Sequence, residues 1–220
     1  MREMKIEWVR TVSRIIFAIL SFIMMVGLIS CEDQLDKITP STNSSIQEAS
    51  TKGPQTVQAE LYTIAEGQHS CDKSTFVTEN FDTLEFKAKF DSSAIYKTII
   101  SNNQADINKL YGLSDCGSLH QVNSARFGWR WYNNHLEIWA YTYNDSVRDY
   151  KLVGTVSFNE FNTYKIIFTE AKYIFLLNEK RIEMPRHCSA TAKGYRLYPY
   201  FGGDETAPHA IKIWISDSIN

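Results

Sequence analysis

The sequence predicts an all-β domain built as an antiparallel sandwich, and two observations lead to that prediction. Apolar and polar residues alternate with a period of two through most of the chain after residue 58, as they do in a strand with one buried face. Short turn sequences rich in Asn, Gly and Asp separate the alternating segments. Many short strands with almost no helix are typical of a sandwich or a barrel, and a sandwich is favoured because several strands carry aromatic residues on both faces.

The alternation locates the strands one by one. In segment 84–90, Leu84, Phe86 and Phe90 share one face with Ala88, so we expect that face to be buried and the intervening charges to meet water. The same pattern predicts further strands at 125–131, 136–143, 150–156, 164–169, 173–177, 195–201 and 210–215. One short helix is expected, at 104–110.

The first thirty residues have the features of an export signal. Four basic residues precede an apolar run at 15–27, which is shorter than the ~20 residues that a membrane-spanning helix needs. Leu28, Ile29, Ser30 and Cys31 follow, and this run resembles the lipobox that the lipoprotein signal peptidase cleaves. The resemblance implies that 1–30 is removed, that Cys31 carries lipid, and that the protein is an outer-membrane lipoprotein on the periplasmic or cell-surface side. The alternative is an uncleaved signal anchor.

Segment 31–57 is rich in Ser, Thr, Gln and Pro and poor in large apolar residues, which predicts a flexible tether that leads to a single domain at 58–220. The chain has 23 basic and 25 acidic residues, and removal of 1–30 would leave 19 and 23, a net charge of −4. A nucleic-acid partner would require a basic surface, so this charge argues against one.

Cysteine usage predicts a disulfide and no zinc site. With Cys31 lipidated, Cys71, Cys116 and Cys188 remain in an oxidising compartment. We favour the pair Cys116–Cys188, because each lies in a loop just before a strong strand, and the other pairings stay open. The cysteines and histidines have no zinc-ligand spacing. Asp204 and Glu205 could bind Ca²⁺, although a plain turn is the stronger interpretation there.

Three strands carry a candidate ligand-binding surface. If they lie in one sheet with these faces aligned, planar rings and guanidinium groups form the floor of a groove. Aromatic rings stack on the flat faces of sugars, and arginine pairs with carboxylate or sulfate, so the groove would suit an acidic glycan. The alternative is that the rings pack beneath loops and the arginines are solvated. The residues expected on this floor are Arg126, Arg130, Glu137, Trp139, Tyr141, Tyr143 and Tyr198, with Arg196 and Tyr200 on the same face as Tyr198.

The order of elements over 80–217 resembles the concanavalin A-like jelly roll of legume-type lectins, laminin G-like domains, β-glucanases and polysaccharide lyases. The features that carry the resemblance are WYNNHLEIWAYTY, the hairpin YIFLLNEKRI, and a Gly-rich loop before the closing strand HAIKIWI. More narrowly, the chain is similar to small lipoproteins of polysaccharide-degrading Bacteroidetes.

Catalytic motifs of that fold are missing from the sequence. The alginate-lyase runs RxELR, QIH and YxKxGxYxQ are absent, as is the paired-carboxylate run of retaining glucanases, and Glu137 is the nearest lone acid. The leading hypothesis is therefore a non-catalytic, lipid-anchored carbohydrate-binding module for an acidic polysaccharide. A polysaccharide lyase or glycoside hydrolase of the same fold, with Tyr141, Tyr143, His135, Arg126 and Arg130 as candidate groups, is the first alternative. A structural or protein-interaction lipoprotein is the second.

Overall fold

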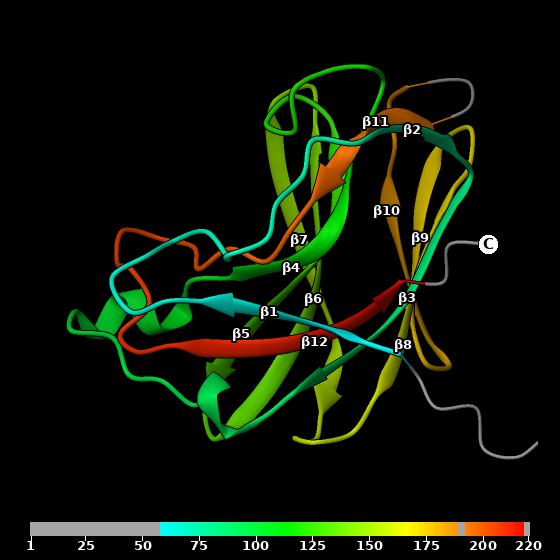
Figure 1. The fold of residues 1–220 in the computed structure, drawn as a ribbon. Helices are drawn as coiled ribbons and strands as arrows, with labels where there is room; N and C mark the ends of the chain where they lie inside the picture. The colour runs from blue at the N-terminus through cyan, green and yellow to red at the C-terminus, as the bar shows by residue number, and fades with distance from the viewer. Residues whose placement is uncertain (1–57, 189–191, 218–220) are drawn as a thin grey trace, which may run out of the picture. The chain divides into compact units, whose positions relative to one another are not determined.

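The structure is a computed structural model that describes residues 58–188 and 192–217, which form two antiparallel six-stranded sheets stacked as a sandwich (Figure 1). The predicted signal segment, Cys31 and the whole of the predicted tether lie outside the described residues. Within the described ranges, no helix combines the length and apolar character needed to cross a membrane.

The first sheet has the strand order β1-β12-β3-β8-β9-β10. Strands that are distant in sequence are paired in this sheet; β12, for example, lies between β1 and β3. The chain therefore crosses repeatedly between the two sheets. The strands are β1 (Glu60–Ile64), β3 (Thr83–Phe90), β8 (Asn162–Phe168), β9 (Lys172–Leu177), β10 (Lys180–Pro185) and β12 (Ile211–Asp217).

The second sheet has the order β2-β11-β4-β5-β6-β7. Its centre is the hairpin of β5 and β6, whose turn at Asn133 and Asn134 adopts positive φ at both positions, as a tight hairpin turn requires. The strands are β2 (Thr78–Phe81), β4 (Asn108–Ser114), β5 (Ser124–Tyr132), β6 (His135–Asn144), β7 (Val147–Val156) and β11 (Ala192–Leu197).

The core lies between the sheets, and it confirms the alternation predicted for 84–90. Phe86 and Phe90 on β3 are buried with Leu84 and Ala88, whereas Glu85 and Lys87 point away from the core. The ring of Phe86 stacks on Tyr164 with centroids 5.0 Å apart and contacts Phe127 edge-on. Burial of each such side chain stabilises the fold by roughly 1.5–3 kcal/mol, so this aromatic centre holds the two sheets together.

The prediction of a helix at 104–110 is wrong. Residues Ser101–Ala105 form a short 3-10 helix, η2, a second 3-10 turn lies at Ser92–Ala94 (η1), and 108–114 are strand β4. The backbone of β4 pairs with β5 on one side and β11 on the other, and these long-range ladders override the weak local helix preference. The alternation also failed to locate β1, β2 and β10, which are short.

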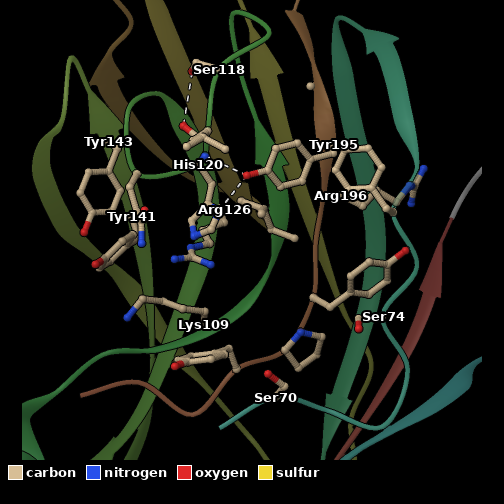
Figure 2. A pocket seen from close by; sticks show the side chains of 18 of the residues that line it. Ser70, Ser74, Lys109, Ser118, His120, Arg126, Tyr141, Tyr143, Tyr195 and Arg196 are labelled. Atoms are coloured by element: carbon tan, nitrogen blue, oxygen red, sulfur yellow. Dashed lines mark hydrogen bonds between the residues drawn. The ribbon is translucent and has the colours of Figure 1, made fainter. Parts of the chain in front are cut away.

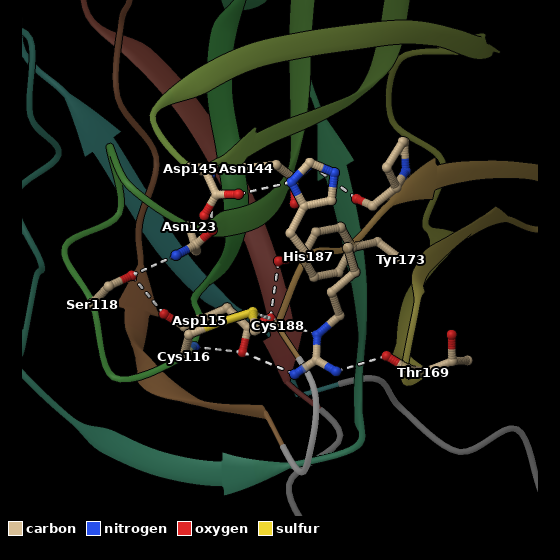
Figure 3. Close-up of a disulfide and its surroundings, with 12 residues drawn as sticks. Asp115, Cys116, Ser118, Asn123, Asn144, Asp145, Thr169, Tyr173, His187 and Cys188 are labelled. Carbon is tan, nitrogen blue, oxygen red and sulfur yellow. Dashed lines mark hydrogen bonds and ion pairs between the residues drawn. A yellow bond between two sulfur atoms is a disulfide. The ribbon is translucent and has the colours of Figure 1, made fainter.

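Cys116 is disulfide-bonded to Cys188, with Cα atoms 6.0 Å apart, which is the pairing that the sequence favoured (Figure 3). Beside it lies a buried carboxylate, Asp115, which accepts hydrogen bonds from Arg186 Nε at 2.7 Å and the Tyr173 hydroxyl at 2.9 Å. The backbone N–H of Cys116 also donates to this carboxylate. These contacts fix the start of loop 115–123 against the end of β10. Cys71, the remaining cysteine of the described part, is buried and not disulfide-bonded.

Candidate ligand-binding groove

A groove of about 900 Å³ opens on the outer face of the second sheet (Figure 2). Its floor is formed by side chains of β4, β5 and β6 that point away from the core, and β11 with loop 117–121 forms one wall. Segment 198–203 closes one end. The volume is within the range that holds a small ligand or a few sugar units.

Arg126 occupies the floor of the groove. Its neighbours on β5, Ala125 and Phe127, face the core, so alternation directs the arginine to the outer face. Gly112 on β4 lies directly opposite, and a Cβ at that position would collide with Arg126, so the glycine makes room for the guanidinium stem. The Nε atom of Arg126 is buried and has no hydrogen-bond partner among the described residues. The floor therefore presents a partly buried cation whose Nε has unsatisfied donor capacity.

Lys109 lies beside Arg126 on the same floor. Its Nζ atom is 4.4 Å from the centroid of the Tyr141 ring, and the Arg126 guanidinium carbon is 5.5 Å from the same centroid. Burial lowers the pKa of Lys109 to about 7, and the nearby charges of Arg126 and Arg148 add to this lowering. The amine therefore changes charge near neutral pH.

The groove lining is basic. It contains Lys109, Arg126, Arg148, Lys193 and Arg196, and none of its lining residues is Asp or Glu. Arg196 is neutralised from behind by Glu79, at 2.7 Å, and by Asp217. The other four cations form none of the ion pairs found among the described side chains. A chain that is acidic overall thus concentrates positive charge in this groove.

One wall of the groove holds a His–Tyr pair. The Tyr195 hydroxyl is 2.8 Å from His120 Nδ1 and also accepts the backbone N–H of His120 at 3.0 Å (Figure 2). Burial lowers the pKa of His120, and the charge of Arg126 lowers it further. A neutral imidazole can accept the tyrosine proton at Nδ1, which leaves its Nε2 atom as a donor.

The structure separates the residues expected to form a single surface. Arg126, Tyr141 and Tyr143 line the groove together, and Tyr198 lines its edge, where its hydroxyl contacts Thr75. The other three residues form a distinct cluster that is not part of the groove lining, although they face the same side of the sheet: Arg130, Glu137 and Trp139.

The outer face expected for Arg196 is wrong, although Arg196 and Tyr198 do lie together, since both contact Tyr111. Arg196 pairs in register with Leu113, whose side chain faces the core, so Arg196 also points inward. There it bonds Glu79 and the Tyr111 hydroxyl, which makes burial of its charge tolerable. Tyr195 and Leu197 take the outer face instead.

The groove residues that were not found from the sequence include Lys109, Arg148, His120 and Tyr195. Lys109 falls in the segment expected to be helical, and Arg148 precedes the expected start of its strand. Tyr195 was placed on the wrong face by the error at Arg196. Recognition of 108–114 as a strand would have shown that Lys109 and Arg126 lie on neighbouring strands.

The Ca²⁺ site considered at Asp204 and Glu205 stays a prediction, and the structure shows another role for one of these carboxylates. Both oxygens of Glu205 accept backbone N–H groups, from Ile99 at 2.7 Å and Ile100 at 2.8 Å. Within the described ranges, the one group of three potential metal ligands consists of Asp115 with Cys116 and Cys188, and those two sulfurs are bonded to each other.

Solved structures show which fold this arrangement belongs to. A glycoside hydrolase family 16 endo-glucanase from Bacteroides ovatus has a TM-score of 0.50 and 8% identity to this chain, covering 72% of this chain and 78% of its own. A mixed linkage glucan GH16 protein of the same organism, in complex with a G4G4G3G product, gives the same values. The domain has the concanavalin A-like jelly-roll fold. The predicted fold class is thereby confirmed.

An alginate lyase, AlyC3, is also similar, with a TM-score of 0.49 and 11% identity over 71% of this chain and 72% of its own. No protein-family model matches the sequence, and no curated protein matches it. At 8% identity, the similarity to the two GH16 structures establishes the fold and leaves the chemistry to be argued from the groove.

Proposed function

We propose that the groove binds an acidic polysaccharide, and the observation that carries this proposal is the buried, unpaired Nε of Arg126 on an acid-free floor. Burial of a cation without a counter-ion is unfavourable, and an anionic ligand group would relieve this cost. A carboxylate or sulfate group can accept two parallel hydrogen bonds from a guanidinium group. Lys109 and Arg148 supply further charge beside it.

The uncharged part of the lining supports a sugar as the body of the ligand. The groove has accessible planar rings at Tyr143 and Tyr200 and hydroxyl groups at Ser70 and Ser74, whereas Tyr141 is buried beneath Lys109. Rings pack on the apolar faces of sugars, while hydroxyl groups exchange hydrogen bonds with sugar hydroxyls. The similar Bacteroides ovatus GH16 protein, described in complex with an oligosaccharide product, adds an argument by analogy of fold.

A binding assay tests the proposal. The full chain, purified in a non-ionic detergent, is run through gels that contain alginate, polygalacturonate, chondroitin sulfate or a neutral glucan. We expect at least one acidic polymer to retard the protein, and Arg126→Gln to weaken that binding by roughly 30-fold or more, since loss of one partner of a desolvated charge pair costs about 2–5 kcal/mol.

The matched control is Arg181→Gln, which removes an exposed arginine that is paired with Glu183 on the other sheet. This variant should bind like the wild type. If no acidic polymer retards the wild-type protein, or if both variants behave alike, the groove is not an acidic-glycan site. Capture of a protein partner with no glycan binding would instead favour the structural alternative.

We also propose that lipid on Cys31 tethers this domain to the outer membrane, on the basis of the signal-like segment 1–30. Metabolic labelling with a palmitate analogue should mark the wild-type chain and leave Cys31→Ser unmarked. Equal labelling of both would disprove lipidation at this residue.

The His120–Tyr195 pair favours a second candidate, a polysaccharide lyase acting by β-elimination. In that reaction, a base removes the proton α to a uronate carboxylate and the C–O bond to the neighbouring sugar breaks. A C=C bond forms, and the leaving oxygen takes a proton. Tyr195 and His120 could exchange these protons while Arg126 neutralises the carboxylate.

Digestion of uronate polymers distinguishes a lyase from a binding module. A lyase would generate unsaturated ends that absorb ultraviolet light, and Tyr195→Phe would abolish this signal while binding persists. Binding without any unsaturated product would exclude a lyase.

A further inference from the structure

The outer face of the second sheet carries, beyond the groove lining, a second cluster of side chains that are hydrogen-bonded to one another. Arg130 Nε bonds Glu137 Oε2 at 2.6 Å, and the indole N–H of Trp139 donates to the same oxygen at 3.2 Å. Another nitrogen of Arg130 donates to the Ala105 carbonyl at 2.6 Å, and its guanidinium carbon lies 4.5 Å from the Trp139 ring centroid. These contacts hold the indole in one orientation and leave the cluster electrically neutral.

Aromatic rings connect this cluster to the groove. Tyr150 on β7 lies between Trp139 and the groove residue Tyr141, with ring centroids 5.8 Å and 6.4 Å away, respectively. The planes of Tyr141 and Tyr150 differ by 14°, so the two rings lie nearly parallel, with Tyr141 buried at 4% exposure beside the open ring of Tyr150. Tyr150 is 45% exposed and its strand neighbour Leu152 is 46% exposed, although both are large and apolar. We call Tyr141, Tyr150 and Trp139 the aromatic track.

The chemistry of the track differs from that of the groove. Four of the groove cations form no ion pair with the described side chains, whereas Arg130 and Glu137 beside Trp139 form an ion pair whose side chains are 13% and 14% exposed. Arg148 marks the boundary, 5.8 Å from the Tyr150 ring. A surface of fixed rings without net charge recognises shape and apolar area, and its rigidity reduces the entropy lost on binding.

We propose that the aromatic track is a sugar-stacking subsite that continues the groove, so that the ligand is a chain with an acidic unit over Arg126 and following units over Tyr150 and Trp139. This inference rests on the proposed function of the groove. The continuity of the rings from Tyr141 onward argues for the same glycan chain as the occupant of both. Recognition of the following units depends on their ring faces and not on their charge.

A chain-length series tests the inference. Oligomannuronates and oligogalacturonates, from the disaccharide to the octasaccharide, are titrated calorimetrically into the full chain in detergent. For the wild type, affinity should rise with length. Trp139→Ala and Tyr150→Ala should each remove about three- to tenfold of affinity for the long oligomers and leave the disaccharide unchanged, because one ring contact is worth about 0.5–1.5 kcal/mol.

Two controls separate the causes. Trp214→Ala removes a partly exposed tryptophan that, like Trp139, has a cation over its ring, in this case Lys89 at 4.8 Å. Trp214 lies on the first sheet, so this variant should bind oligomers of every length like the wild type. Arg126→Gln should weaken binding at all lengths. The more exposed position of Tyr150 keeps the test usable if Trp139→Ala fails to fold.

The outcomes are distinguishable. Equal loss at every length, or no loss, in the track variants overturns the inference while the groove proposal stands. An affinity that does not rise with length for the wild type overturns it as well. If no oligomer binds the wild type, the proposed function fails and the track loses its ligand with it.

Discussion

The ion pair between Asp115 and Arg186 should dominate the stability of the domain near the disulfide. The side chains of Asp115 and Arg186 are 0% and 1% exposed, and Arg186 donates to Asp115 at 2.7 Å. Asp115→Asn preserves the shape of the side chain but removes the buried negative charge that accepts the hydrogen bond from Arg186 Nε. Loss of one partner of a buried pair costs about 3–5 kcal/mol. For a domain of this size, the Tm should fall by roughly 6–20 °C.

The same region provides a matched control. Asp145 pairs with His187 at 2.9 Å, but these side chains are 71% and 53% exposed, so water screens their charges. Asp145→Asn should therefore change stability by less than about 1 kcal/mol. Both variants are measured by urea denaturation with far-ultraviolet circular dichroism. If Asp115→Asn costs no more than Asp145→Asn, the reasoning from burial is refuted.

Because both charges are buried, we also predict that a double variant without either charge recovers stability relative to Asp115→Asn. Asp115→Leu with Arg186→Met removes both charges together, so it should be more stable than Asp115→Asn, because no uncompensated charge remains. Tyr173 would lose its acceptor in this variant, which sets a limit on the recovery.

The remaining predictions concern the groove and the core. Glycan binding should weaken as pH rises through about 7, because Lys109 loses its proton there. Titrations at pH values on either side of 7 measure this dependence, and Lys109→Met should remove it. An unchanged pH profile in this variant would contradict the role of Lys109. The low pKa of Lys109 in the folded state, against 10.5 ordinarily, also means that folding stability should rise from about pH 7 toward 10.5, since the unfolded chain keeps this proton longer. Asp106 opposes the shift only weakly. Tyr164→Phe should raise the unfolding free energy by about 1–3 kcal/mol, because its buried hydroxyl has no hydrogen-bond partner among the described residues. The control Tyr173→Phe should lower it, since that hydroxyl bonds Asp115, and a loss of stability in both variants would count against the argument.

The sequence by itself determined the fold class and most strands of the domain. A strand with one buried face must alternate apolar and polar residues, so Leu84 to Phe90, Ala125 to Trp131 and Leu136 to Tyr143 revealed both their conformation and their buried faces. For the same reason Arg126, Tyr141 and Tyr143 could be assigned to one outer face before any coordinates.

Only the tertiary structure decided which outer-face residues form the groove. Lys109 and Arg126 meet because β4 pairs with β5, which the local sequence of 104–110 does not reveal. Arg196 turns inward because its partners Glu79 and Asp217 come from strands at opposite ends of the chain, β2 and β12. Alternation shows which residues of a strand share a face. Strand register and counter-ions that are distant in sequence decide whether a charged residue lies on the buried face or on the outer face.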